Sequence, residues 1–189
     1  MIMGLSGRKG SGKTAVAEYL AECYGFHVVA LADPMKQAVR AVFGWSADHT
    51  DGDLKETVDP RWGISPRQAL QDIGEQWGQF GLCDRFPAFA ETTGRLLWTR
   101  RALAQCDPRE PWIVSDVRYE HEAEAIRADG GFVVRIIRPG HEKSDPHGSE
   151  SLEWPADEVV VNEGPILKAV AAVVRAYQHR RGSLTRPRA

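Results

Sequence analysis

The sequence has few cysteines, and their spacing excludes two kinds of site. Among 189 residues there are only Cys23, Cys83 and Cys106, and no two of them form a CxxC pair. An odd number of cysteines with this spacing argues against a disulfide framework and against a cysteine-based zinc site. We expect the three thiols to be small buried or idle side chains in a reducing compartment.

The sequence also lacks an excess of charge and a long apolar run. Its 24 Lys and Arg residues nearly balance 26 Asp and Glu residues, which gives a net charge of -2, and the two signs are interleaved. This balance gives no electrostatic reason to expect a nucleic-acid or membrane surface. No apolar run approaches the roughly 18 residues that span a bilayer, and the chain opens directly into a strand pattern rather than a signal peptide. We therefore expect a soluble, cytoplasmic protein.

Only the end of the chain has an excess of positive charge. Arg180, Arg181, Arg186 and Arg188 occur there among Gly, Ser, Thr and Pro residues. This composition predicts a basic flexible tail, over 183–189, rather than a nucleic-acid-binding arm. The chain is 42% hydrophobic overall. Residues 1–182 are therefore expected to form a single domain with one hydrophobic core.

Apolar runs alternate with helical patterns along the chain. The expected strands cover residues 2–6, 26–32, 112–115, 132–137 and 159–161. The expected helices cover residues 14–24, 34–44, 65–77, 96–106, 120–128 and 165–178. Near-continuous apolar strands separated by helices predict an α/β fold of three layers, with a parallel five-stranded sheet and helices on both faces. Two polar segments without a clear period, about 45–64 and about 139–156, are predicted to be mobile lid or substrate-binding insertions.

Residues 7–14 read GRKGSGKT and fit the phosphate-loop pattern GxxxxGK[ST] completely. The pattern falls between a predicted buried strand and a predicted helix, where glycines let backbone N–H groups encircle phosphate oxygens. Lys13 is expected to reach the β- and γ-phosphates of ATP, and the Thr14 hydroxyl to ligate Mg²⁺. The candidate ATP-binding residues of this loop are Gly7, Lys9, Gly10, Ser11, Gly12, Lys13 and Thr14.

A phosphate loop alone does not separate a kinase from a GTPase or a motor ATPase. The sequence has no NKxD-type guanine reader, and the third predicted strand closes in Ser115 and Asp116 without a second acid directly after. Small size and two polar insertions favour a small-metabolite kinase, whose lids close to keep water from the transferred phosphoryl group.

Further segments resemble, in order along the chain, the deoxynucleoside monophosphate kinases of the bacteriophage type. The family patterns are ADPLK, RxLLQxLGTExGR, DVRFxNEA, GGxVIRIxRP, HxSE and NxG. The matching segments here are 32–36, 67–78, 116–123, 130–139, 147–150 and 162–164. Glu75 stands where the family has threonine. An aromatic-rich insert, about 80–93, precedes Trp98, which matches the family's substrate-side tryptophan.

The resemblance implies roles for charged residues near the phosphates. Asp33 would be a base, a Mg²⁺ organiser or a helix cap. Arg67 and Arg118 would grip the acceptor monophosphate with paired hydrogen bonds, with Lys36 as a further cation. Arg138, at the root of the second insertion, would stabilise charge on the transferring phosphoryl group.

Other candidates have alternative interpretations. Asp116 would either bind the base or sugar or orient Arg118, and Glu122 would either face the substrate or be a solvated helix residue. Asn162 would either pack on adenine or be a turn residue. The remaining substrate-side candidates come from the matched segments and are Gly74, Trp98 and Ser149.

The function implied is ATP + dNMP giving ADP + dNDP, with ATP and Mg²⁺ required and small molecules as the partners. The alternatives are another small-metabolite kinase, acting on a nucleoside or dephospho-coenzyme A, and a nucleotide-binding regulatory module. A homodimer and a phage origin are implied by the resemblance alone.

Overall fold

The computed structural model describes residues 1–140 and 152–181. Most of the second predicted insertion and the predicted tail over 183–189 lie outside the described residues. The chain forms two compact units, one made of Met1–Ala30 with Ala102–Ala189 and the other of Leu31–Arg101. Each unit is described separately below.

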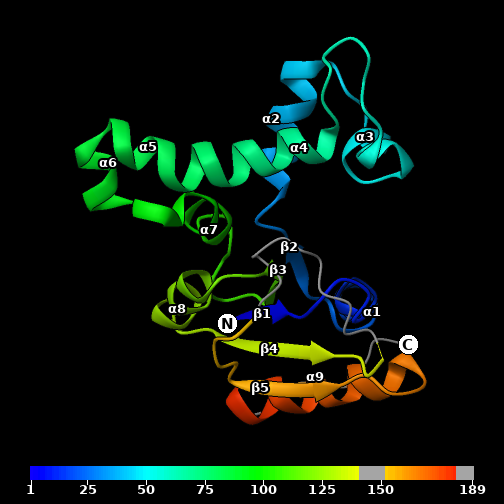
Figure 1. Cartoon of the computed structure of the whole chain (residues 1–189). Helices are drawn as coiled ribbons and strands as arrows, with labels where there is room; N and C mark the ends of the chain where they lie inside the picture. Colours follow the sequence, from blue (N-terminus) through cyan, green and yellow to red (C-terminus); the bar gives the residue numbers. More distant parts are fainter. Residues whose placement is uncertain (141–151, 182–189) are drawn as a thin grey trace. The chain divides into compact units, whose positions relative to one another are not determined.

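The first unit contains one sheet of five strands in the order β2-β3-β1-β4-β5 (Figure 1). All neighbouring strands pair in parallel, which confirms the predicted sheet. The strands are β1 (Ile2–Ser6), β2 (His27–Val29), β3 (Trp112–Val117), β4 (Phe132–Ile137) and β5 (Glu158–Val161). β2 is shorter than expected because, at the edge of the sheet, it pairs only with β3 before the chain leaves for the second unit.

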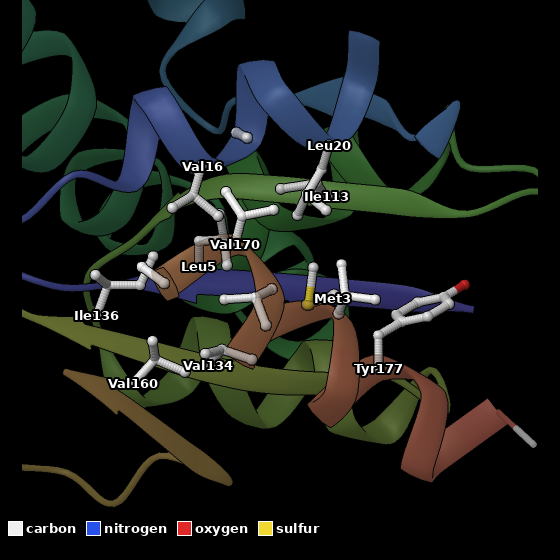
Figure 2. Close-up of a cluster of buried hydrophobic side chains, with 14 of the residues drawn as sticks. Met3, Leu5, Val16, Leu20, Ile113, Val134, Ile136, Val160, Val170 and Tyr177 are labelled. Atoms are coloured by element: carbon white, nitrogen blue, oxygen red, sulfur yellow. The ribbon is translucent and has the colours of Figure 1, made fainter. Parts of the chain in front are cut away.

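One face of the sheet is covered by α1 (Lys13–Tyr24) and α9 (Ile166–Arg181). The alternate residues Met3 and Leu5 of β1 are fully buried there, in a cluster that includes Val16 of α1 and residues of α9 (Figure 2). Side chains on a strand alternate between faces, so this cluster uses one face of β1 only.

The opposite face is covered by α8 (Glu120–Ala128). Gly4 of β1 points to it, and a Cβ atom on Gly4 would lie 3.0 Å from a methyl group of Ile126 and 3.0 Å from Val117. The close approach of α8 to β1 therefore requires glycine at position 4. Helices on both faces confirm the predicted three-layer arrangement.

The second unit is helical. Its elements are α2 (Asp33–Phe43), α3 (Ala47–Thr50), the 3₁₀ helix η1 (Asp53–Glu56), α4 (Pro66–Gln71), the π-helix η2 (Asp72–Gly81), α5 (Leu82–Arg85), α6 (Pro87–Thr92), the 3₁₀ helix η3 (Gly94–Leu96) and most of α7 (Leu97–Leu103). Part of the insert that we expected over 80–93 forms α5 and α6.

The predicted helix start at Ser65 and Pro66 is confirmed. The Ser65 hydroxyl accepts a hydrogen bond from the Gln68 N–H at 3.3 Å, and the Ser65 N–H donates to the Gln68 side chain at 2.9 Å. This reciprocal pair satisfies two backbone groups at a helix end that would otherwise lack partners, and Pro66 occupies the first turn.

Part of the segment about 45–64, predicted to be a mobile insertion, packs into a core of the second unit. This segment contains α3 and η1, and Trp45 is buried with Val39 and Ala69 in a hydrophobic cluster of the second unit. The Trp45 indole N–H donates to Asp59 at 2.7 Å. The sequence of this segment does not predict the burial of Trp45, because one large side chain in a polar stretch, rather than a periodic apolar pattern, provides the packing.

The C-terminal helix is longer than expected. Arg180 and Arg181 belong to α9 rather than to a tail, and Arg181 donates to the Tyr177 hydroxyl at 3.0 Å. Arg186 and Arg188 lie outside the described residues. In the part of the chain that the structure describes, we find no helix with the length and apolarity needed to cross a bilayer.

Candidate active site

The phosphate loop joins β1 to α1 at the carboxyl end of β1. All three of its glycines have positive φ angles: 145° at Gly7, 80° at Gly10 and 102° at Gly12. Residues with a Cβ rarely adopt this conformation, and at Gly7 a Cβ would also collide with the Ile136 carbonyl. The loop therefore has the glycine-dependent shape that the sequence pattern predicts.

Lys13 and Thr14 begin α1. The Lys13 ammonium group donates to the backbone carbonyls of Gly7 and Arg8, at 2.9 Å from the latter, and so lies over the loop. Thr14 is exposed, and the first turn of α1 contains no acidic residue. The positive end of the helix dipole and the Lys13 charge thus act together on a bound anion.

Asn162 follows β5 and holds the loop through Ser11. Its side-chain nitrogen donates to the Ser11 carbonyl at 2.8 Å, and both residues are buried. In a trans peptide the C=O and the following N–H point in opposite directions, so this bond turns the Gly12 N–H away from Asn162. The geometry supports a positioning role for Asn162 on the loop, and its contact with adenine stays a prediction.

The loop residues fit the phosphates of ATP. The positive φ angles of its glycines let the loop curve without side chains that would obstruct a phosphate. Lys13 supplies a cation. The Ser11 hydroxyl is buried without a hydrogen-bond partner among the described residues. The exposed Thr14 hydroxyl is of the kind that ligates Mg²⁺ beside such phosphates. Within the described residues, no cluster of three or more His, Cys, Asp or Glu side chains could hold a metal ion.

Arg118 lies between β3 and α8, directly after the carboxyl end of β3. Glu122 is 6% exposed, and one of its carboxylate oxygens accepts the N–H groups of Arg118 and Tyr119 at 2.8 and 3.0 Å. Burial raises the pKa of Glu122 to about 7, although these two hydrogen bonds act in the opposite direction. Glu122 is therefore not a solvated helix residue; it orders the turn that carries Arg118.

A residue that sequence reasoning missed acts on the same turn. The Trp154 indole N–H donates to the Arg118 carbonyl at 3.0 Å. Trp154 is buried, and it lies in a segment outside the quoted motifs. The sequence signal for a buried contact at this position is the tryptophan itself, which stands among polar residues.

The carboxyl ends of the parallel strands share one edge of the sheet. The phosphate loop follows β1 there, Arg118 follows β3, Arg138 follows β4 and Asn162 follows β5. Arg138 is exposed, while Asp116 is half-buried inside β3. One edge of the first unit thus carries the candidate donor residues together with Asp116 and Arg118.

The other acceptor-side candidates belong to the second unit. Asp33 is the first residue of α2, whose N-cap is Ala32, so the helix-cap alternative for Asp33 is wrong. The Lys36 ammonium lies 3.8 Å from Asp33 and 2.5 Å from Asp51. Asp33 and Lys36 therefore sit together on the first turn of α2.

Arg67 makes an ion pair. Its Nε and Nη2 groups both donate to one carboxylate oxygen of Glu56, at 2.9 and 2.8 Å. Glu56 is 63% exposed, while Arg67 is 26% exposed. An exposed pair of this kind contributes little to stability, so the carboxylate is readily replaced by another anion.

Gly74 and Trp98 contact each other inside the second unit. The Trp98 indole N–H donates to the Gly74 carbonyl at 2.8 Å, and Trp98 is 9% exposed. A Cβ on Gly74 would lie 2.7 Å from the Met35 sulfur, so glycine allows η2 to pack on α2. Both residues have a packing role, and their contact with substrate stays a prediction. Ser149 lies outside the described residues.

The fold and the phosphate loop define a P-loop kinase. The shikimate kinase of Aquifex aeolicus has the same fold, with a TM-score of 0.50, 14% identity and coverage of 97% of this chain and 99% of that one. The chain belongs to the deoxynucleotide monophosphate kinase family. A relative from Acanthamoeba polyphaga mimivirus, whose description names this activity, is 37% identical over 156 residues, 79% of this chain and 80% of the relative.

Two further comparisons agree with this family. The family model for deoxynucleotide monophosphate kinase matches residues 94–172. The deoxynucleotide monophosphate kinase of Enterobacteria phage T4 is 38% identical over 121 residues, which cover 60% of this chain but only 45% of the phage protein. The family resemblance that the motifs predict is thereby confirmed.

Proposed function

We propose that this protein transfers the γ-phosphoryl group of ATP to the phosphate of a deoxynucleoside monophosphate, giving ADP and the diphosphate for DNA synthesis. The observation that carries the proposal is a complete phosphate loop at the carboxyl edge of a five-stranded parallel sheet, in a chain that belongs to this kinase family.

On the donor side, the N–H groups of residues 7–14 and the Lys13 ammonium bind the phosphates of ATP. Lys13 would exchange the carbonyls of Gly7 and Arg8 for phosphate oxygens. The Thr14 hydroxyl would hold Mg²⁺, which would neutralise charge on the phosphates. The contribution of the chain is to position the γ-phosphoryl group and to stabilise its charge during transfer.

On the acceptor side, the attacking phosphate oxygen is already ionised, so a strong general base is unnecessary. Asp33 would then position the acceptor or organise Mg²⁺ through water. Arg118, Arg67 and Lys36 would neutralise the acceptor phosphate, and Arg67 would exchange Glu56 for it. Arg138 would act on the transferring group from the end of β4.

Two finer points rest on the resemblance to the phage enzymes. We propose that the enzyme works as a homodimer and that it acts in the cytoplasm of a host cell. Light scattering of the purified protein tests the first point, because a monomer at micromolar concentration would contradict it.

Binding tests the proposal without turnover. The melting temperature is measured with a non-hydrolysable ATP analogue and Mg²⁺, in the presence of each of four dNMPs, four NMPs, thymidine or dephospho-coenzyme A. Ligands that bind the native state raise its stability, so at least one dNMP should give the largest shift. A larger shift with thymidine or dephospho-coenzyme A would favour another metabolite kinase, and no shift with any acceptor would favour a regulatory module.

A further inference from the structure

The main chain of Arg118 is held on both sides by buried side chains. Its N–H donates to Glu122 of α8, and its carbonyl accepts from Trp154, which precedes β5. Glu122 also accepts the N–H of the next residue, Tyr119. Two side chains that are distant from each other in the sequence thus fix three polar groups in one short turn.

Trp154 is itself fixed by Arg135 of β4. The Arg135 guanidinium lies 4.4 Å from the centre of the Trp154 ring, and Arg135 donates to the Trp154 carbonyl at 2.6 Å. Trp154 is 8% exposed, so its indole cannot swing into solvent without uncovering a large apolar surface. The contact to Arg118 is therefore made from a rigid support on the sheet.

This arrangement is more than a surface turn needs. Water normally satisfies the polar groups of exposed turns, and Arg118 itself is exposed. Fixing its backbone on both sides restricts the directions its long side chain can take. Such restriction is useful when a guanidinium must meet a ligand in a fixed paired geometry.

We propose that Glu122 and Trp154 form a clamp on the main chain of Arg118, and that Trp154 is a positioning residue for binding of the acceptor phosphate. The inference rests on the proposed function, because it assigns Arg118 to the acceptor. Trp154 touches neither substrate in this account; it acts through Arg118.

The test is Trp154→Phe, which keeps an aromatic ring under Arg135 but removes the N–H donor. Trp112→Phe is the matched control, because the Trp112 indole N–H is buried without a hydrogen-bond partner among the described residues. We expect Trp154→Phe to raise KM for the dNMP about five- to tenfold. This is the size expected for loss of one hydrogen bond, here the bond from the Trp154 indole that positions Arg118. KM for ATP should stay within about twofold in both variants, and Trp112→Phe should leave KM for the dNMP unchanged.

A double mutant separates the clamp from general damage. In an Arg118→Ala background, Trp154→Phe should raise KM for the dNMP no further, because its effect passes through the missing guanidinium. An unchanged KM for the dNMP in Trp154→Phe, equal losses for ATP and the dNMP, or a full additional loss in the double mutant would each overturn the proposal.

Amide hydrogen exchange distinguishes failure of the clamp from failure of the proposed function. In Trp154→Phe, the amides of Arg118 and Tyr119 should exchange at least tenfold faster than in the Trp112→Phe control, whatever the substrate. Faster exchange in an enzyme that phosphorylates no dNMP would retain the clamp but reject the substrate class. Unchanged exchange would reject the clamp.

Discussion

Asn162 and Ser11 are 151 residues apart in the sequence, yet the Asn162 side chain donates a hydrogen bond of 2.8 Å to the Ser11 carbonyl, and both residues are buried. A Cβ on the neighbouring Gly12 would lie 2.5 Å from the same nitrogen. The end of β5 therefore fixes both the direction of one loop peptide and the requirement for glycine at position 12.

Asn162→Asp should weaken ATP binding selectively. The substitution keeps the shape of the side chain but replaces the donating amide nitrogen with an accepting carboxylate oxygen. This oxygen repels the Ser11 carbonyl, so the peptide that directs the Gly12 N–H away from residue 162 and toward the phosphates is disfavoured. We expect KM for ATP to rise about tenfold, equivalent to ~1.4 kcal/mol, with KM for the dNMP within about twofold. Glu163→Gln, at the next and exposed position, is the control. An unchanged KM for ATP would show that the loop does not depend on Asn162.

Lys13→Ala should abolish phosphoryl transfer while the fold persists. A lost cation at the transferring group costs several kcal/mol of barrier, and each ~1.4 kcal/mol is tenfold in rate. Turnover is measured at saturating ATP, with Lys168→Ala on the exposed face of α9 as the control. If the purified variant keeps more than a tenth of wild-type turnover, Lys13 does not have the assigned role.

Glu122→Gln should change how stability depends on pH. Burial raises the pKa of Glu122 from 4.5 to about 7, so folding favours the protonated form. The corresponding stabilisation is complete below about pH 4.5 and is lost as pH rises through about 7. Glutamine imitates the protonated form at every pH.

The unfolding free energy of the wild type should therefore fall relative to Glu122→Gln between about pH 5 and pH 8, by an amount on the order of 2 kcal/mol. Urea denaturation at several pH values measures the difference. A difference that does not vary with pH would mean that Glu122 stays ionised in its buried position.

Gly78→Ala should destabilise the second unit. A Cβ at position 78 would lie 2.6–2.7 Å from three atoms of the Trp98 indole. We expect a loss of about 1–3 kcal/mol in unfolding free energy, as overpacking of a core usually costs. Because phenylalanine is smaller, the double variant Gly78→Ala with Trp98→Phe should lose less than the sum of the two single losses. Additive losses would contradict the clash.

The sequence predicts those parts of the site that depend on local patterns. The phosphate loop has a fixed spacing between a strand and a helix, and the Ser65 cap is a reciprocal pair within four residues, so both follow from neighbours in the sequence. The strands follow from apolar runs, because the central strands β1, β3 and β4 are largely buried, whereas the edge strands β2 and β5 are apolar but more exposed.

Contacts between distant segments could not be predicted in this way. No periodic pattern links Trp154 to Arg118 or Trp45 to Asp59, since each contact depends on the fold bringing one side chain to one backbone or carboxylate group. The family motifs identified Glu122 and Asn162 as residues of interest. Only the structure shows that their polar atoms are bonded to backbone groups of the site.

The substrate class is tested most directly by initial rates with purified enzyme, ATP and Mg²⁺. Values of kcat/KM are compared for dGMP, dTMP, dCMP and dAMP against adenosine, thymidine and dephospho-coenzyme A, with formation of both ADP and the phosphorylated product measured by chromatography. The account predicts that at least one dNMP has the highest kcat/KM and yields one dNDP for each ADP. Faster phosphorylation of a nucleoside or of dephospho-coenzyme A, or ADP formation without dNDP, would contradict it.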